Sequence, residues 1–489
     1  MAGLKRREIL AMLAAIGAGG PALAWVQSGP VQERLPWAKF RTTPDYPKLV
    51  SAVRTMKANA NAASPDSWLF WAGIHQSHCP HGKDYFLAWH RGYLSLFEQQ
   101  LRKAARSTSL RLPYWDYFAD PKLPAELLAG NAATNPLFET RKGSEVGKAL
   151  VYAAFGSDVT GFEHGVKNCF EANVEAFHNN VHNLIGGRMA TMQSPQDLIF
   201  WMHHANIDRL WTAWALAGRG RQMPAPGTPY WGGQLDYAAG LSVKRAEAMT
   251  PEALGYRYAN LKMPLLEASN ADAAAEPPPE GRGGVKVPTS VLGERGAPVT
   301  VPTPSPTPRR RVGAAPPPPP LVGAAPPPAA APAPAAAAPI PFRGIWLGRE
   351  SRSIRMPLRR GGEMPASHDH GAATELSVVL DAVTLTQAGE SGGYFYKLYL
   401  DLDDLDYDQV PGEDRLLGTV GPFQIAAALN HAEGGRARIE LPAADIVRRL
   451  ADGRDPEELG VTFVRVDAGR APGGSVINID RVEFRGRLG

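Results

Sequence analysis

The sequence predicts a mainly α-helical domain followed by a small all-β domain, with a linker of different composition between them. Residues 25–270 carry apolar side chains at helical spacing, and residues 342–489 change to the alternation of half-buried strands. Residues 271–341 are dominated by proline, alanine and glycine, a composition that cannot bury a core. We therefore expect two folded domains joined by an extended spacer with polyproline character.

Two segments of the first domain show the clearest helical patterns. In one of them, side chains recur every three or four residues along a single face: Leu87, His90, Leu94, Phe97 and Leu101. The other is expected to open at Ser194, with Pro195 in its first turn and Asp197 completing a capping-box-like pattern, and to continue through Trp211. Both expected helices carry histidines.

The second domain contains five segments with strand-like patterning, which are residues 375–386, 394–402, 436–441, 461–466 and 476–484. In the second segment, one face is formed by alternating residues: Tyr394, Tyr396, Leu398 and Leu400. A helix is expected from residue 443 to 452. This pattern predicts a small antiparallel sandwich or barrel.

The first 24 residues have the pattern of an export signal. Lys5, Arg6 and Arg7 precede an apolar stretch at residues 9–16, and small residues at 22–24 form a cleavage site. The arginine pair resembles a twin-arginine signal, although a general secretory signal or a short anchor is the alternative. The apolar stretch is shorter than a spanning helix of about 20 residues. We therefore expect an exported protein, periplasmic or secreted, that uses the twin-arginine machinery and has no stable membrane insertion.

Charge and cysteine content exclude two classes of protein. The 52 basic and 48 acidic side chains give a formal net charge of +4, which creates no strong field for nucleic acid. Nucleic acid is therefore not an expected partner. Cys79 and Cys169 are the only cysteines, too few for a scaffold built on disulfides.

Histidine clustering is the main functional signal, because nine of the twelve histidines lie between His75 and His204. His178 and His182 are four residues apart, which places two imidazoles on one helical face at a spacing suited to a metal ion. A zinc protease would need Glu directly after His178, and Asn179 stands there instead.

The segment around His203 and His204 adds a further candidate ligand. Helical geometry predicts that His204, not His203, points inward. Asp208 lies one turn beyond His204 and could accept a hydrogen bond from a ligand imidazole, which would fix its tautomer.

Together these segments resemble the central domain of tyrosinase over roughly residues 40–260, and residues 254–258 resemble the tyrosine motif that closes this domain in plant polyphenol oxidases. The resemblance rests on Trp71 to His75, Cys79-Pro80-His81, Phe86 to Tyr93, His178 to His182 with Gly186-Gly187, and Phe200 to His204. It implies a four-helix bundle around a dicopper centre, and imidazole ligation without carboxylates suits copper, although zinc also accepts imidazole.

The same resemblance implies the copper ligands and the reaction. The first copper would be held by His75, His81 and His90, with His78 as the rival for His75, and the second by His178, His182 and His204. The coppers would use dioxygen as co-substrate to oxidise small phenols and o-diphenols to o-quinones, with ortho-hydroxylation of monophenols. The alternatives are a catechol oxidase or an o-aminophenol oxidase without that hydroxylation, and a haemocyanin-like oxygen carrier.

Two further features are implied by the family. A glutamate, with Asn179 as its partner, would orient a water that helps to deprotonate phenols; Glu175 is the first candidate and Glu171 the alternative. Cys79 stands two residues before His81, the spacing at which related enzymes form a Cys to His thioether. A disulfide with Cys169, or two buried thiols, are the other possibilities.

Residues 396–404, 459–464 and 477–484 resemble the C-terminal domain of plant polyphenol oxidases. In these relatives the domain covers the copper site and keeps the enzyme latent until the linker is cut. An exposed linker is a plausible target for an activating protease. The alternative is a tethered domain that stabilises the protein or binds another molecule.

Overall fold

A computed structural model describes residues 3–4, 31–166, 168–264, 342–357, 375–401, 411–432, 435–451 and 458–486. The expected linker lies outside the described residues. So does the expected export signal, except for the short strand β1 (Gly3–Leu4), which pairs with β3 (Met223–Pro224). No helix in the described part of the chain is long and apolar enough to cross a membrane.

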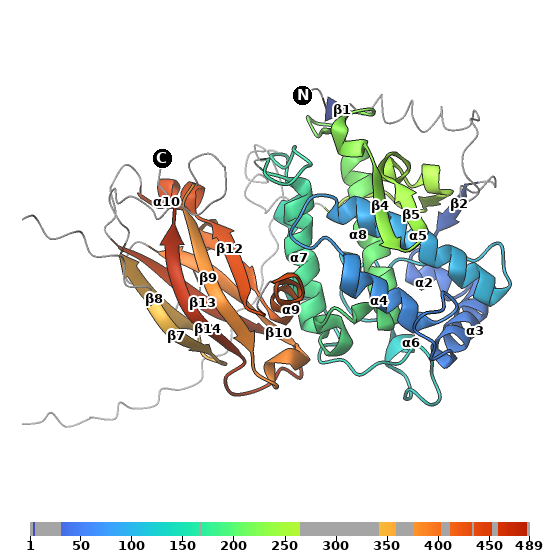
Figure 1. Cartoon of the computed structure of the whole chain (residues 1–489), viewed down its shortest axis with the longest axis horizontal. Helices are drawn as coiled ribbons and strands as arrows, with labels where there is room; N and C mark the ends of the chain where they lie inside the picture. The colour runs from blue at the N-terminus through green and yellow to red at the C-terminus, as the bar shows by residue number, and fades with distance from the viewer. Residues whose placement is uncertain are drawn as a thin grey trace, which may run out of the picture. The chain divides into compact units, whose positions relative to one another are not determined.

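The first region is mainly helical, as predicted (Figure 1). Its helices are α2 (Trp37–Phe40), α3 (Asp45–Ala58), α4 (Trp68–His78), α5 (Phe86–Ala105), α6 (Ala125–Leu128), α7 (Phe170–Ile185) and α8 (Leu198–Leu216). Two small antiparallel strands, β4 (Gln234–Ala238) and β5 (Leu241–Lys244), pair with each other. The core is strongly aromatic, and the rings of Phe97 and Trp201 stack with centroids 3.4 Å apart.

The start of α8 differs from the prediction. Residues Ser194–Gln196 form a separate 3-10 turn, and α8 begins only at Leu198. Asp197 is extended, with φ −93° and ψ 131°, and its carboxylate accepts the backbone N–H of Ile199 as the N-cap. The indoles of Trp68 and Trp201 both donate to the Pro195 carbonyl, which holds the turn in place.

A buried ionic network ties both ends of the helical region to its centre. Asp208 of α8 accepts hydrogen bonds from Arg91 Nε at 2.5 Å and from the hydroxyls of Tyr256 and Tyr258, each at 2.6 Å. Both tyrosines lie on β6 (Tyr256–Tyr258), which pairs in parallel with β2 (Gln32–Arg34). Removing one partner of such a buried pair typically costs about 3–5 kcal/mol, so the network is structural.

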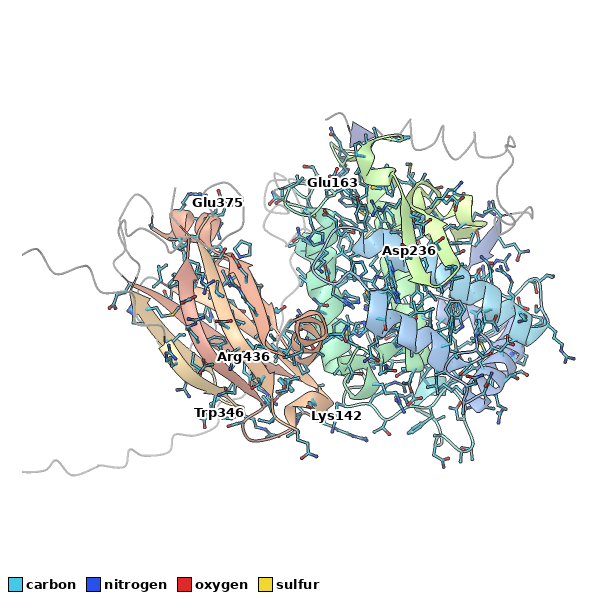
Figure 2. The ribbon with its side chains drawn as sticks, viewed as in Figure 1. Lys142, Glu163, Asp236, Trp346, Glu375 and Arg436 are labelled. Carbon is cyan, nitrogen blue, oxygen red and sulfur yellow. The ribbon has the colours of Figure 1, made fainter. Side chains whose placement is uncertain are left out.

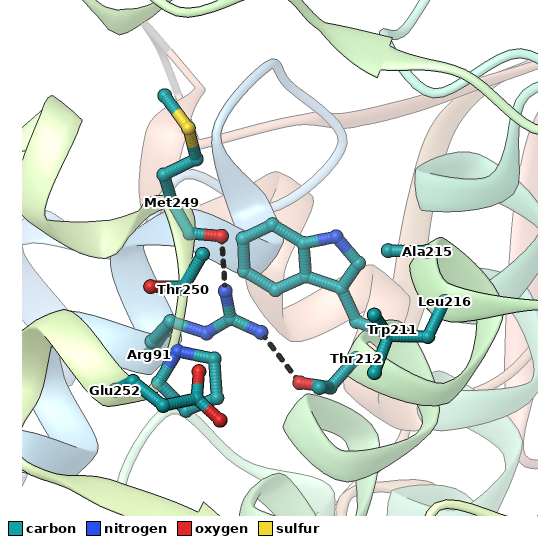
Figure 3. A pocket seen from close by; sticks show the side chains of 9 residues that line it. Arg91, Trp211, Thr212, Ala215, Leu216, Met249, Thr250 and Glu252 are labelled. Atoms are coloured by element: carbon teal, nitrogen blue, oxygen red, sulfur yellow. Dashed lines mark hydrogen bonds between the residues drawn. The ribbon is translucent and has the colours of Figure 1, made fainter. Parts of the chain in front are cut away.

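Arg91 also borders a pocket lined by Trp211, Thr212 and residues 249–252 (Figure 3). Its guanidinium already donates to Asp208, Thr212 and two backbone carbonyls. None of the clustered histidines lines this pocket. The pocket therefore offers no free cation for a ligand and is separate from the site described below.

The second region is an antiparallel β-sandwich of two four-stranded sheets, in the orders β11-β10-β13-β8 and β12-β9-β14-β7 (Figure 1). The strands are β7 (Phe342–Leu347), β8 (Arg352–Pro357), β9 (Ser377–Leu385), β10 (Tyr394–Asp401), β11 (Leu416–Val420), β12 (Ala437–Pro442), β13 (Glu458–Asp467) and β14 (Ile477–Arg485). The inner faces of both sheets supply one apolar core, and Trp346, labelled in Figure 2, lies exposed on an edge strand.

All five predicted strands are present, and the predicted helix matches α10 (Ala444–Ala451). Three strands and helix α9 (Pro422–His431) were not predicted. Strand β11 was not predicted because it is short and contains a glycine. Helix α9 was not predicted because it begins at a proline that follows a glycine. The helical and β regions belong to one compact unit, and Phe395 of β10 is part of the core of the helical region.

Candidate metal centre

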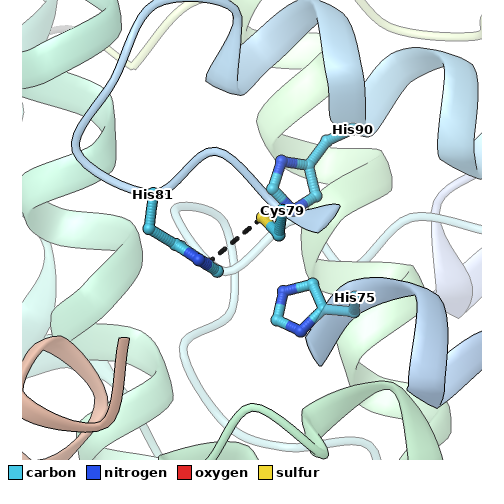
Figure 4. Close-up of side chains that lie close together, drawn as sticks. All are labelled: His75, Cys79, His81 and His90. Carbon is cyan, nitrogen blue, oxygen red and sulfur yellow. Dashed lines mark hydrogen bonds between the residues drawn. The ribbon is translucent and has the colours of Figure 1, made fainter. Parts of the chain in front are cut away.

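Three histidines and a cysteine from three neighbouring segments form the first cluster (Figure 4). His75 lies in the last turn of α4, His81 in the following loop and His90 on α5. The ring centroid of His75 is 5.0 Å from that of His81 and 5.9 Å from that of His90. One potential ligand atom from each of these residues and from Cys79 lies within 4.8 Å of the others.

The second cluster joins helices α7 and α8. His178 and His182 face the same way on α7, with ring centroids 4.5 Å apart. The Nε2 atoms of His178 and His204 are 3.1 Å apart, so the two imidazoles converge on one point. His203 belongs to the same cluster and is fully buried, which contradicts the prediction that only His204 points inward. Helix α8 is buried on all sides from Leu198 to Trp214, so helical periodicity could not separate these neighbours.

The two clusters face each other and form a single site. The rings of His90 and His204 stack with centroids 4.0 Å apart and an interplanar angle of 11°. His81 and His178 also face each other, with centroids 6.3 Å apart. Four helices and one loop therefore bring the histidines into one buried space, as expected for a metal site in a bundle core.

Backbone carbonyls orient three of the imidazoles. Nδ1 of His75 lies 2.9 Å from the Met192 carbonyl oxygen, and Nδ1 of His182 lies 2.7 Å from that of Met189. Nδ1 of His90 is 2.8 Å from the carbonyl oxygen one turn earlier in α5. A carbonyl oxygen only accepts, so each Nδ1 must carry the proton, and the Nε2 lone pair is left for a metal.

Burial keeps the imidazoles neutral. It lowers the pKa of His182 to about 3, and it lowers the pKa values of His90, His178 and His204 well below the usual range. Neutral imidazole is the form that binds metal ions. Nε2 of His182 is buried and has no hydrogen-bond partner in the described structure, an arrangement that a bound metal would satisfy.

The structure distinguishes the two rivals for the first position. His75 is 1% exposed and points into the first cluster, whereas His78 lies exposed at the end of α4. Residues 76–78 form the exposed end of α4, and the chain turns back into the site at the buried Cys79.

Cys79 and Cys169 are both buried and neither is in a disulfide. Sγ of Cys79 lies 3.5 Å from Nε2 of His81 and 3.5 Å from Nε2 of His90. Cys169 instead caps the start of α7, where its thiol donates to the Phe162 carbonyl and accepts the N–H of Ala172. Of the predicted alternatives, the disulfide is therefore absent, and the Cys79 thiol stands directly beside His81.

Glu171 and Glu175 both lie buried next to the loop that carries His81. Oε1 of Glu175 accepts the N–H of Gly82 at 2.7 Å, and Oε1 of Glu171 accepts that of Leu87 at 2.8 Å. Burial raises the pKa of Glu175 to about 8, although the hydrogen bond from Gly82 opposes this effect, and burial also raises the pKa of Glu171 well above its usual range.

Asn179 contacts a ligand imidazole, and Asp208 differs from its expected role. The side-chain oxygen of Asn179 lies 3.1 Å from Nδ1 of His178, so Asn179 orients that imidazole, and Glu175 has other partners. Asp208 was expected to accept a hydrogen bond from a ligand imidazole. It binds Arg91 and two tyrosines instead, and Nδ1 of His204 has no hydrogen-bond partner among the described residues. Arg91 reaches Asp208 from α5 and occupies the carboxylate oxygen that was expected to bind the imidazole.

Phe423, whose ring covers the site, was not predicted from the sequence. Its centroid is 4.0 Å from that of His182, and the rings are nearly parallel. The same ring meets His81 and His178 edge to face, at 5.2 Å and 5.6 Å. Phe423 lies in the first turn of α9, in the β region, and a Gly-Pro-Phe turn carries no sequence signal for such a contact.

Comparison with known proteins supports this site. The common central domain of tyrosinase matches residues 65–155 and 135–217. The tyrosinase of Streptomyces glaucescens is 30% identical over 191 residues, which cover 30% of this chain and 69% of that protein. The G-type haemocyanin of Enteroctopus dofleini is 32% identical over 170 residues, or 30% of this chain and only 6% of that protein.

Solved structures show the same fold across both regions. The latent apple tyrosinase has a TM-score of 0.51 at 15% sequence identity, and the match covers 95% of this chain and 98% of that chain. A latent aurone synthase, a polyphenol oxidase, has a TM-score of 0.50 at 15% identity and covers 96% of this chain and 93% of that one.

Fold and site together define a type-3 copper protein, because its two facing histidine clusters fit two copper ions. The chain belongs to the tyrosinase family.

We expect the metal-free chain to take up two copper ions, and His90→Ala to retain about one, since the substitution removes one of three imidazoles from one cluster. Metal analysis after dialysis measures the copper content. His78→Ala is the matched control, because it removes an exposed histidine, and it should still bind two ions. Full copper content in His90→Ala would contradict the expected first site.

Proposed function

We propose that this chain is a phenol oxidase that uses dioxygen and two copper ions to convert phenols and o-diphenols into o-quinones. The observation that carries the proposal is the pair of facing clusters of neutral histidines. Three imidazoles would hold each copper: His75, His81 and His90 for the first, and His178, His182 and His204 for the second. His204 is preferred to His203 because its ring stacks on His90 and its Nε2 approaches that of His178.

The overall reaction balances without another co-substrate. A phenol and one dioxygen give an o-quinone and one water, and a catechol needs half a dioxygen for the same products. Bound copper supplies the redox chemistry. The chain's own residues hold the metals, exclude water from a buried site and receive the proton of the phenolic hydroxyl.

Glu175 is the proposed acceptor of that proton. It lies one helical turn before His178, and its carboxylate binds the backbone next to His81. A carboxylate accepts a proton only when ionised, so this activity should increase with pH towards the pKa of about 8. Two bound copper ions would lower that pKa, since nearby cations stabilise the carboxylate. Glu171 is the alternative, one turn further from His178.

Oxygen uptake by the copper-loaded chain, with 4-methylphenol and then 4-methylcatechol, tests this proposal. Uptake with both should occur, and the monophenol rate should increase with pH across the neutral range. Glu175→Gln should lower the monophenol rate on the order of a hundredfold and catechol oxidation far less. Glu171→Gln is the matched comparison. Uptake with catechol alone would indicate a catechol oxidase, and the same assay with 2-aminophenol detects an o-aminophenol oxidase.

We also propose that the β region keeps the site closed through Phe423. The ring is fully buried against His182, His81 and His178, where a phenol ring would have to enter. Stacking of an aromatic ring on an imidazole is the contact that a phenolic substrate would also make. Phe423 therefore occupies the place of a substrate.

Asn183, next to His182, anchors this covering residue. Its side-chain oxygen accepts the N–H of Phe423 at 2.8 Å, and its amide donates to the side chain of Gln424 at 2.8 Å. Its backbone carbonyl accepts the N–H of Gly393 at 2.7 Å. Three hydrogen bonds from one residue hold α9 and the start of β10 beside the second cluster.

Glycines allow the close approach of the two regions. A Cβ on Gly392 would lie 2.6 Å from Cβ of Ala190 and 2.8 Å from Cα of Gly186. A Cβ on Gly421 would collide with the side chain of Asn183. Any other residue at these positions would push the covering segment away from the histidines.

Phe423→Ala should raise phenol oxidation by the intact copper-loaded chain by about tenfold or more. Removing a buried phenylalanine ring costs about 3–5 kcal/mol of packing, which here stabilises the closed arrangement of the site. Each 1.4 kcal/mol lost from the closed arrangement raises the ratio of open to closed molecules about tenfold. Phe484→Ala, which shortens a partly buried side chain of β14 away from the site, is the control.

Cleavage of the linker by an activating protease should raise the rate of phenol oxidation by the wild type as much as Phe423→Ala does. Cleavage of the Phe423→Ala variant should raise its rate little further. If the variant and the cleaved chain both bind dioxygen reversibly but turn over no phenol, the chain is an oxygen carrier like the haemocyanins that it resembles in part.

We further propose that the chain is exported, periplasmic or secreted, through the twin-arginine machinery. The support is the arginine pair before a short apolar stretch. Replacing Arg6 and Arg7 with lysines should leave the protein inside the cell, as cell fractionation measures. Export that is unaffected by this change would indicate a general secretory signal instead.

A further inference from the structure

A third group of titratable residues lies beside the metal centre and is not used by the proposed chemistry. His164 lies in the loop formed by residues 161–166 and 168–169, next to Glu163, which is labelled in Figure 2. Its Nε2 lies 3.6 Å from Oε2 of Glu175 and 3.7 Å from Oε2 of Glu171. One imidazole nitrogen therefore faces two buried carboxyl groups at once.

The loop is held in this position by its own hydrogen bonds. Its two ends form a bridge between Gly161 and Cys169, and the N–H of Phe170 donates to the Gly161 carbonyl at 2.9 Å. The Cys169 thiol donates to the carbonyl of Phe162. These contacts fix the loop over the start of α7, where Glu171 and Glu175 lie.

Each glutamate uses its two oxygens differently. Both Oε1 atoms accept backbone N–H groups of the segment between His81 and His90, and both Oε2 atoms face His164. The Oε2 side is therefore the side from which each carboxyl group can exchange its proton. These separations of 3.6 Å and 3.7 Å are longer than a direct hydrogen bond, so a proton bound there would pass to the imidazole through one bridging water, and the bond to the backbone would stay intact.

His164 is also the least buried member of the group. Its side chain is 21% exposed, whereas those of Glu171 and Glu175 are 0% and 7% exposed. Burial lowers the pKa of His164, with Asp84 opposing that effect, while burial raises the pKa values of both glutamates. Near neutral pH the imidazole is therefore neutral and the carboxyl group of Glu175 is protonated.

We propose that His164 is the proton outlet of the active site, a positioning residue that takes the proton from Glu175 and exchanges it with solvent. In this step the Oε2–H bond of Glu175 breaks and an Nε2–H bond forms on His164, which leaves a carboxylate and an imidazolium. The carboxylate is then ready to accept the proton of a phenol. This inference rests on the proposed role of Glu175 in phenol oxidation.

The groups that face this pair come from three elements. Glu171 lies on α7, Asp84 lies in the segment before α5, and the Cys79 thiol at the end of α4 is close enough to Glu175 to interact with it electrostatically. Asp84 favours the imidazolium form of His164. The buried thiol stays protonated, because burial raises its pKa.

Two substitutions of His164 distinguish a role in proton exchange from a role in packing. His164→Gln keeps a polar group of similar reach that cannot take up a proton, whereas His164→Lys keeps a group that can. His78→Gln is the matched control at an exposed histidine outside both clusters. All rates are measured in the copper-loaded full chain carrying Phe423→Ala, with 4-methylphenol and 4-methylcatechol across a range of pH. Each monophenol rate is divided by the catechol rate of the same sample, which cancels any loss of folded or copper-loaded protein.

We expect His164→Gln to lower this ratio about tenfold or more at neutral pH, because the glutamine side chain cannot take up the proton of Glu175. Catechol should respond less, since its second hydroxyl hydrogen-bonds to the oxygen that loses its proton. His164→Lys should recover part of the ratio, and His78→Gln should leave it unchanged.

An unchanged ratio in His164→Gln would overturn the inference, as would an equal loss in the glutamine and lysine variants. A parent chain that oxidises catechol alone would instead remove the proposed hydroxylation, and with it this role of His164. That outcome is visible before any His164 variant is made.

Discussion

The metal centre depends on hydrogen bonds that the imidazole Nδ1 atoms make with backbone carbonyls. The carbonyls of Met189 and Met192 belong to the segment between α7 and α8, which is not part of either helix. This segment therefore orients His182 and also His75, which arrives from α4. Because the acceptors are carbonyls, the tautomer follows from the fold, and every Nε2 so oriented is available to a metal.

Two buried carboxylates of the helical region illustrate how environment divides roles. Asp208 meets an arginine and two tyrosine hydroxyls, so its charge is fully compensated and it connects β6, α5 and α8. Glu175 meets a backbone N–H and an imidazole, and burial raises its pKa to about 8. A compensated charge stabilises a fold, whereas a carboxyl group that titrates near neutral pH can take part in chemistry.

The contact at Phe423 joins the metal centre to the packing of the β region. The ring is held by a backbone hydrogen bond to Asn183, and glycines at 186, 392 and 421 allow the backbones to approach. Such a contact is specific but small, because it rests on one ring and a few hydrogen bonds. Under the proposed closure of the site, a modest change in the packing of the two regions changes the access of phenols to the histidines.

The sequence by itself determined the fold class, five of the eight strands of the sandwich and the histidine-rich segments, because these depend on local spacing. His178 and His182 share a face whatever surrounds their helix. Only the tertiary structure decided that His75 rather than His78 enters the site, that His203 is buried beside His204, that Asp208 binds Arg91 and that Phe423 covers the centre. Each of these outcomes depends on a contact between segments far apart in the chain, and residue spacing along one segment contains no information about its distant neighbours.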